Sequence, residues 1–237
     1  MVEKYSWITI VPIFAGLVFS AWYFMIGGLL VSGLNFTNAV MALILGNIIL
    51  LGIFYKYGGL GQKLNASSSQ IASSLFGTHG SKYFFSVLLS IGQIGWFAII
   101  ADIGGRALSN VSFLSSNMGV VVYAIITIFI AIAGIRVMSY VKGFLTVATM
   151  GLALMGLNNA LRAPVIYPEE ESLFFSGVGI VIASVISFCT VTPDYMRYLG
   201  SRKHVFLSSF FGFFIPALFA GFLEIMFTIT IRTWNLT

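Results

Sequence analysis

The sequence predicts an all-α integral membrane protein, a polytopic bundle of helices that cross a bilayer. Of its 237 residues, 59% are hydrophobic and 8% are charged, whereas a soluble domain usually carries about 25% charged residues. The mean hydropathy is +1.00. The apolar runs are about 20 residues long and do not alternate with polar residues, which favours helices over the strands of a membrane barrel. The lipid bilayer is therefore the expected surrounding of this chain.

Seven membrane spans are predicted from the lengths of these runs. They lie at residues 8–32, 37–56, 82–107, 117–135, 139–160, 173–196 and 204–231. A polar segment rich in glycine and serine, Lys56 to Lys82, is predicted to be a loop. The acidic triplet 169–171 lies in a second loop. It is interpreted as a solvated cap rather than a metal site, because three adjacent glutamates cannot all face one ion.

Lysine and arginine residues are distributed unevenly between the two sides of these spans. One side carries nine: Lys4, Lys56, Lys63, Lys82, Arg136, Lys142, Arg197, Arg202 and Lys203. The other side carries three: Arg106, Arg162 and Arg232. Cytoplasmic segments are the ones enriched in these residues. The chain is therefore expected in a plasma or inner cell membrane, as a multi-pass protein with a cytoplasmic amino terminus.

Charged residues inside or beside the spans predict two local pairs and one isolated carboxylate. Asp102 with Arg106, four residues apart, and Asp194 with Arg197, three apart, each share a helix face and are expected to pair. Glu224 has no base near it on its own helix. A lone carboxylate in a membrane is costly. Glu224 therefore has two open roles, in proton or cation coupling or in a structural hydrogen bond.

The segment 91–97 (IGQIGWF) places an amide and an indole within a span. Gln93 and Trp96 are three residues apart and share a helix face. Gln93 can donate and accept hydrogen bonds, and Trp96 offers a flat aromatic surface. The glycines at 92 and 95 allow a ligand or a second helix to approach. The pattern suits a small planar heterocycle.

Two spans carry residues typical of helices that break in the middle of a membrane. The first contains Pro12, Gly16, Ser20, Gly27 and Gly28. Such residues can free carbonyl groups for a cation, or simply allow close helix packing. The sixth contains hydroxyl side chains before a proline, at positions 184, 187, 190 and 192. These can line a transport site or bond to their own helix, and both readings remain open.

Other classes of function receive no support from the sequence. The net charge of +5 is small and dispersed, which disfavours a nucleic-acid partner. No phosphate-binding loop, nucleophile elbow, HExxH or CxxC motif is present. Neither an enzyme nor a bound organic cofactor is therefore expected.

Four segments, in order along the chain, resemble those of the nucleobase–cation symporters, most closely the cytosine permease branch. They are 16–21 (GLVFSA), 43–47 (LILGN), 92–97 (GQIGWF), and 184–187 (SVIS) running on to 192–198 (TPDYMRY). This resemblance implies the inverted five-plus-five helix fold of leucine-type sodium symporters. Residues 1–160 would form the first five-helix repeat, and residues 161–237 would begin the second with two spans.

The resemblance also implies a substrate site for a nucleobase or a related planar heterocycle such as cytosine. Trp96 resembles the tryptophan that stacks on the base, and Gln93 the glutamine that hydrogen-bonds its edge. Ser20 would line the cavity, with Ser184 and Val185 across the ligand. Relatives usually carry an aromatic residue at the position of Val185, so the base would be stacked on one face.

The resemblance further implies coupling of uptake to Na⁺ or H⁺. The backbone carbonyls of Gly16 and Phe19 would match half of a sodium site. Family members have about twelve spans, so a chain of seven is expected to be a truncated, split or partial member that is inactive alone. The alternatives are a seven-span receptor or sensor and a non-functional permease remnant. The sequence indicates no oligomeric state.

Overall fold

The computed structural model describes residues 4–160, 162 and 173–231. The elements in this part of the chain are helices, with π-helical segments marked η. They are α1 (Trp7–Val18), α2 (Ala21–Val31), α3 (Phe36–Leu64), α4 (Ser68–Gly80), η1 (Ser81–Phe85), α5 (Ser86–Asn110), α6 (Ser116–Ile132), α7 (Ile135–Ala160), α8 (Phe174–Cys189), α9 (Thr192–Met196), α10 (Arg202–Leu207), η2 (Ser208–Phe214) and α11 (Ile215–Ile231). The predicted all-α class is confirmed. The acidic triplet 169–171 lies outside the described residues.

The apolar helices coincide with the seven predicted spans. Four are long and apolar enough to cross a membrane: Phe36–Leu64, Ser68–Asn110, Ile135–Asn158 and Arg202–Thr230. The first span is a fifth candidate if its two halves, bent by 53°, are counted together. The remaining two, α6 and α8, are shorter, with 17 and 16 residues. The chain therefore has the multi-pass character that its composition predicts.

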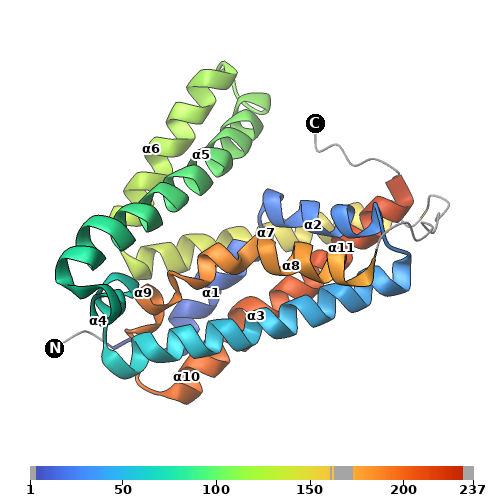
Figure 1. The fold of residues 1–237 in the computed structure, drawn as a ribbon. Helices are drawn as coiled ribbons and strands as arrows, with labels where there is room; N and C mark the ends of the chain where they lie inside the picture. Colours follow the sequence, from blue (N-terminus) through green and yellow to red (C-terminus); the bar gives the residue numbers. More distant parts are fainter. Residues whose placement is uncertain (1–3, 161, 163–172, 232–237) are drawn as a thin grey trace.

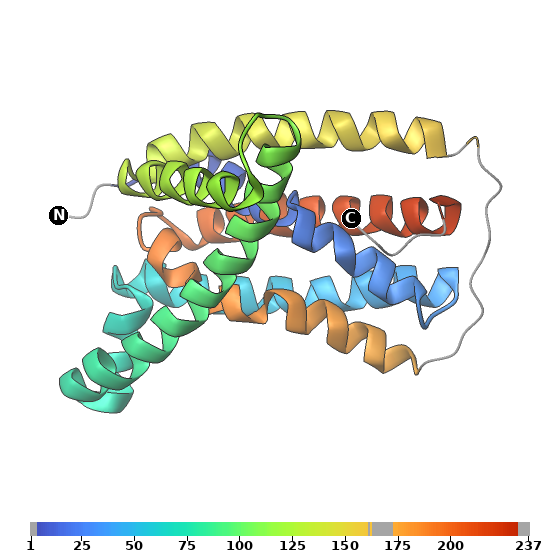
Figure 2. The same cartoon turned by 90° about the horizontal axis from the view of Figure 1, so that it is seen from above.

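Most of the helices run alongside one another in a flat bundle, and one hairpin leaves it. Seen from above, α7 lies along one edge, α3 and α8 lie along the other, and α11 runs between them (Figure 2). The helices α5 and α6 pack on each other and rise away from the bundle (Figure 1).

Aromatic side chains hold the centre of the bundle together. The rings of Phe54 on α3 and Phe213 on η2 stack with centroids 4.2 Å apart. Phe14 on α1 meets Phe54 edge-to-face at 5.6 Å. Offset-stacked and edge-to-face pairs of this kind are the favoured geometries of aromatic rings. Beside them, the buried hydroxyl of Tyr23 donates to Asn47 Oδ1 at 3.2 Å, which satisfies two polar groups inside the core.

The predicted loop between Lys56 and Lys82 is wrong. The second span continues as α3 to Leu64, and the helix α4 follows after a left-handed residue, Asn65. The helix begins with a capping box, in which Ser67 and Gln70 each bond to the other's backbone N–H. Such a box satisfies two free backbone donors at once. Polar residues here therefore start a helix rather than form a loop.

The predicted pairing of Asp194 with Arg197 is also wrong. The carboxylate of Asp194 accepts hydrogen bonds from the backbone N–H and the hydroxyl of Ser68, at the start of α4. A carboxylate is favourable there because free N–H groups and the helix dipole both attract it. Arg197 instead donates to the hydroxyl of Tyr198 at 2.8 Å and lies over its ring. Asp194 thus joins α9 to α4.

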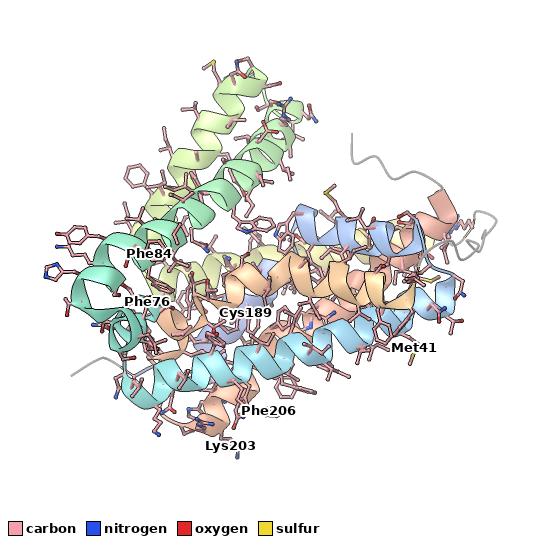
Figure 3. All side chains as sticks on the ribbon, viewed as in Figure 1. Met41, Phe76, Phe84, Cys189, Lys203 and Phe206 are labelled. Atoms are coloured by element: carbon pink, nitrogen blue, oxygen red, sulfur yellow. The ribbon has the colours of Figure 1, made fainter. Side chains whose placement is uncertain are left out.

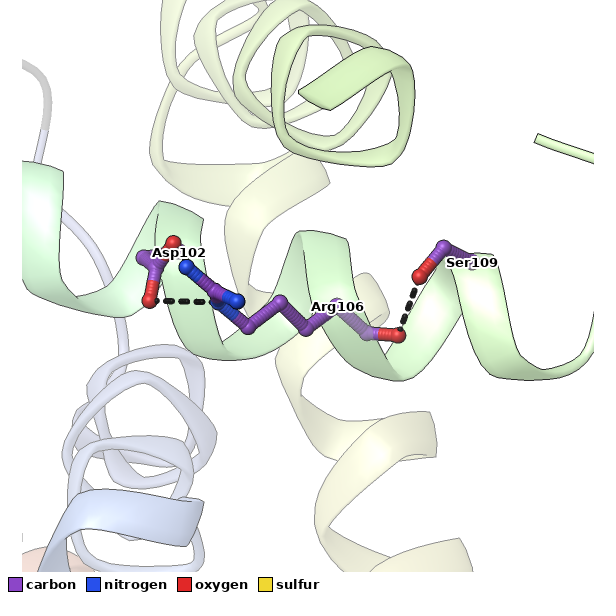
Figure 4. A network of polar contacts seen from close by, with 3 residues as sticks. All are labelled: Asp102, Arg106 and Ser109. Atoms are coloured by element: carbon purple, nitrogen blue, oxygen red, sulfur yellow. Dashed lines mark hydrogen bonds and ion pairs between the residues drawn. The ribbon is translucent and has the colours of Figure 1, made fainter. Parts of the chain in front are cut away.

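The predicted pair of Asp102 and Arg106 is confirmed. The guanidinium Nε of Arg106 lies 2.9 Å from both carboxylate oxygens of Asp102 on α5 (Figure 4). Ser109 closes the group by donating its hydroxyl to the carbonyl of Arg106 at 2.8 Å. Both charged side chains are about half exposed, so the pair contributes little to stability.

Large apolar side chains point outward over much of the surface. Met41 on α3 and Phe206 on α10 project away from the bundle, and Phe76 and Phe84 gather at the turn into α5 (Figure 3). An apolar exterior of this extent is expected of a protein surrounded by lipid. It agrees with the bilayer predicted from composition.

We expect the predicted orientation to appear in cysteine labelling of intact cells. Cysteine at Thr78, which is exposed on α4, should react with a membrane-impermeant maleimide only after the cytoplasmic side is opened. Cysteine at Glu170, outside the described residues, should react from the outside. The unaltered chain is the control, because its single cysteine, Cys189, is buried. The reverse pattern would overturn the orientation.

Candidate functional site

The first membrane span breaks at Phe19 and Ser20, which is one of the two readings left open by its proline and glycines. Phe19 leaves helical geometry with φ −84° and ψ 60°, and Ser20 is extended with φ −137° and ψ 151°. The hydroxyl of Ser20 turns back and donates to the carbonyl of Leu17 at 2.6 Å. The halves α1 and α2 meet at 53°. A break of this kind brings polar backbone groups to mid-membrane depth, where they can serve a ligand.

The sixth span also breaks, between the end of α8 at Cys189 and the start of α9 at Thr192. Its hydroxyl groups mostly bond within their own helix. Ser184 donates to the carbonyl of Val181, and Thr190 to that of Ser187, each at 2.6 Å. This is the plainer of the two readings of the hydroxyl pattern. Among the hydroxyls at 184, 187 and 190, that of Ser187 bonds to a side chain on another helix.

A cavity of about 840 Å³ lies beside the break in the first span. It is bounded by residues from α1, α2, α5, α6, α7 and α11. Predicted site residues Gly16, Phe19, Ser20 and Glu224 line it together. The break therefore opens onto a space large enough for a small heterocycle, whose pockets usually measure about 300–1,000 Å³.

Two charged side chains line this cavity, Lys142 from α7 and Glu224 from α11. The stem of Lys142 lies across Gly16, such that a Cβ atom at Gly16 would sit 3.0 Å from the Cβ atom of Lys142. Glu224 presses on α2 in the same way, since a Cβ atom at Gly27 would sit 2.6 Å from its own Cβ. Thr228 donates to the Glu224 carboxylate over a long 3.5 Å. Each half of the broken span is thus packed, at a glycine, against one charged residue from another helix: Lys142 at Gly16 on α1, and Glu224 at Gly27 on α2.

An aromatic wall joins the cavity to α5 and α8. Trp22, on α2, lines the cavity, and its ring lies 5.1 Å from that of Trp96 on α5. The indole N–H of Trp96 donates to the hydroxyl of Ser187 on α8 at 2.9 Å. The ring of Trp96, on α5, is therefore in contact with α2 and α8 as well, and of the two rings it is that of Trp22 which lines the cavity. We call these two rings the tryptophan pair.

We expect Ser187→Ala to weaken this junction measurably. The change leaves the indole N–H of Trp96 without its partner, at a cost of roughly 1–3 kcal/mol for an unsatisfied buried donor. Thermal unfolding in detergent should report the loss, and the tryptophan emission should shift. Ser184→Ala is the matched control, because its hydroxyl bonds only to its own helix. Equal effects of the two changes would contradict the assigned role of Ser187.

The other predicted site residues take different positions. Gln93 is half-buried on α5 and makes no side-chain hydrogen bond within the described part of the chain. Val185 is fully buried in the core. Neither of them, nor Ser184 or Trp96, is among the residues that line the cavity. The structure thus brings half of the predicted set to one cavity, and the predicted residues on α5 and α8 do not line it.

Sequence reasoning missed Lys142 and Trp22. Lys142 was assigned to a cytoplasmic loop, yet it is the eighth residue of α7 and lies roughly 10 Å along that helix. Its position inside the predicted span 139–160 was the available signal, because a charge within a span is a functional residue by default. Trp22 gave no such signal, since its neighbour Trp96 comes from a distant helix.

Comparison with known proteins identifies relatives along the whole described chain. Residues 3–235 match the family described as permeases for cytosine/purines, uracil, thiamine and allantoin. The cytosine permeases of Escherichia coli K12 and O157:H7 are each 27% identical over 209 residues, covering 84% of this chain and 49% of the relative. The chain therefore spans about half the length of the curated relatives it matches.

A solved structure shares the fold. It is that of Mhp1, a transporter of the nucleobase–cation symport family, in a closed conformation with bromovinylhydantoin bound. The TM-score is 0.85 at 13% sequence identity, over 99% of this chain and 57% of the other. The arrangement of helices described above is therefore a known transporter architecture.

Proposed function

Because the chain belongs to the family of permeases for cytosine/purines, uracil, thiamine and allantoin, we propose that it binds a nucleobase or a related planar heterocycle inside the membrane and takes part in its secondary active transport. The observation that carries this proposal is the meeting of the broken first span, the cavity and the tryptophan pair. A planar ring needs an aromatic surface beside polar groups, and this corner of the molecule offers both.

The residues around the cavity can divide the work of holding such a ring. The tryptophan pair offers aromatic surface, which stabilises a stacked base by roughly 1–3 kcal/mol in other proteins. Gln93 does not line the cavity, but it lies three residues from Trp96 on α5, and its amide has no hydrogen bond within the described residues, so it is free to donate to and accept from the edge of a ring that extends toward α5. Ser20, at the break, lines the cavity two residues from Trp22. These contacts fix orientation as well as affinity.

Transport follows from movement of the two broken spans around this position. Broken helices let one group of helices rock against another while the bound ligand stays near mid-membrane. Here α8 and α9 are joined to α4 by Asp194 and to α5 by Ser187. A rocking motion of the sixth span would therefore carry the wall of the ligand site with it. Such coupling of ligand and helix movement is the basis of alternating access.

We further expect uptake to be driven by a cation, Na⁺ or H⁺. Glu224 lines the cavity opposite the break and makes one long hydrogen bond, which leaves most of its carboxylate open to a charge partner. The matches to permeases give no support to a seven-span receptor or sensor, so transport is the preferred reading.

Uptake by cells that lack their own nucleobase permeases tests the proposal. Two proteins would be produced: the chain alone, and the chain joined to the carboxyl-terminal half of the E. coli cytosine permease. Radiolabelled cytosine, uracil, adenine and hydantoin would be supplied in turn. We expect saturable uptake or binding of at least one of them above that of empty cells. If the protein reaches the membrane and none of the four is bound or taken up, the proposal fails.

A further inference from the structure

The position of Lys142 bears on which cation can occupy the break in the first span. Its side chain runs along Gly16, with a Cβ atom at that glycine lying 3.0, 3.2 and 3.3 Å from the Lys142 Cβ, Cδ and Cγ atoms. Lys142, Gly16 and Phe19 all line the same cavity. The stem of Lys142 therefore packs on the segment whose carbonyls were predicted to hold sodium, and its ammonium group, two bonds beyond Cδ, lies at the same cavity.

The predicted sodium half-site does not fit this surrounding. Sodium is a hard cation and needs several oxygen ligands with no like charge nearby. The carbonyls of Gly16 and Phe19 are two such oxygens, but Lys142 adds a positive charge to the cavity that both residues line. Like charges repel strongly where little water screens them. An ammonium group can itself receive carbonyl oxygens, because it presents three donors.

The charges that line the cavity are already balanced without a metal ion. Among the described residues that line it, Lys142 contributes one positive charge and Glu224 one negative charge. A sodium ion would leave the cavity with one excess positive charge inside the bilayer, which is costly. Removal of Lys142 would reverse the situation, since Glu224 would then lack a counter-charge.

We infer that the ammonium group of Lys142 serves as a tethered cation at the break in the first span, and that this protein therefore binds no sodium ion there. The inference deepens the proposed transport function, on which it rests, by assigning the cation at the ligand site to the chain itself. Lys142 is in this role a positioning residue, whose charge acts on the cavity beside the broken helix rather than on the ligand directly.

A sodium titration tests this assignment without any substrate, in the chain joined to the carboxyl-terminal half of the E. coli cytosine permease, so that an incomplete half-site is not the reason for a missing response. Thermal unfolding in detergent and the emission of Trp22, which lines the cavity, would be followed as NaCl replaces choline chloride at constant ionic strength. We expect no sodium-specific change in the unaltered chain. Lys142→Met should gain a change that saturates at millimolar sodium, because it removes the tethered charge and leaves Glu224 unbalanced.

Two further variants keep the outcome clear. Lys142→Arg retains the charge and should remain insensitive to sodium. Lys142→Gln is a second neutral variant, which should respond to sodium as Lys142→Met does and replaces it if Lys142→Met folds poorly. A saturable sodium response in the unaltered chain would overturn the inference. So would the absence of a response in both neutral variants, because Lys142 would then not be what keeps sodium away.

Binding of radiolabelled cytosine separates this inference from the proposed function. The same samples, with sodium or choline, would be incubated with cytosine, uracil, adenine and hydantoin. Sodium-independent binding by the unaltered chain supports both. If none of the four binds while the sodium responses are as expected, the proposed ligand class is wrong and the role of Lys142 stands.

Discussion

Replacing Trp96 with alanine should weaken binding of the heterocycle by about tenfold or more, because Trp22, the ring that lines the cavity, loses the aromatic neighbour that positions it, and a lost stacking partner costs roughly 1–3 kcal/mol per base. The change also removes the hydrogen bond to Ser187 and the contact with the ring of Trp22. The measurement is equilibrium binding of radiolabelled cytosine to membranes with matched protein content. Trp96→Phe keeps an aromatic ring without the N–H group, and should retain more affinity than Trp96→Ala.

Replacement of Gln93, three residues from Trp96 on α5, distinguishes a role of this helix face in ligand binding from a role in stability. Gln93 makes no side-chain hydrogen bond within the described part of the chain, so Gln93→Ala should leave thermal unfolding unchanged. If the amide contacts the ring, its loss should nonetheless weaken binding, by roughly 1–3 kcal/mol for an unsatisfied ligand group. Unchanged affinity in both Trp96→Ala and Gln93→Ala would mean that this face of α5 serves packing alone.

The fold was largely predictable because lipid restricts a chain more than water does. In a bilayer, every backbone polar group must be bonded within a helix, so apolar length alone locates the spans. The proline and glycines of the first span allowed either a break or close packing, and the structure shows the break at Phe19 and Ser20. Segments outside the bilayer lack this restriction. The helix α4 was accordingly missed, although Ser67 and Gln70 carry the signature of a capping box.

Side-chain partners were predictable only where they are local. Asp102 and Arg106 pair because they are four residues apart on one helix. Asp194 has an equally close candidate in Arg197, yet bonds to Ser68, 126 positions away in the chain. For Asp194, hydrogen bonds at the start of α4 are favoured over the charge of Arg197, which itself makes a cation–π contact with the ring of Tyr198. Such choices depend on packing between distant segments, which periodicity does not report.

The arrangement of the candidate site was also difficult to predict, because it depends on packing between distant segments. Trp96 was expected to face a ligand directly, whereas its neighbour Trp22 is the tryptophan that lines the cavity. Lys142 was counted among the loop charges because positive residues near span ends usually mark the cytoplasmic side. Its contact with Gly16 requires knowledge that α7 crosses α1 at that glycine. The sequence therefore indicates the kinds of group at the site better than their arrangement.

The hairpin of α5 and α6, which carries Gln93 and Trp96, depends on one close helix crossing. A Cβ atom at Gly105 would lie 2.2 Å from the Cα atom of Val120, and one at Gly119 would lie 2.3 Å from the carbonyl oxygen of Gly105. Backbone atoms cannot give way as a flexible side chain can. Gly105→Ala should therefore push the two helices apart and destabilise the protein by roughly 1–3 kcal/mol, the usual cost of overpacking.

Gly95→Ala is the matched control on the same helix, since nothing lies within 4 Å of a Cβ atom there. Alanine favours helix over glycine by roughly 0.5–1 kcal/mol, so this change should leave stability equal or slightly higher. Thermal unfolding of both variants in the same detergent gives the comparison. Because the separated hairpin would also move Trp96 away from Ser187, only Gly105→Ala should alter the tryptophan emission. Equal unfolding temperatures for the two variants would show that α5 and α6 do not meet at Gly105.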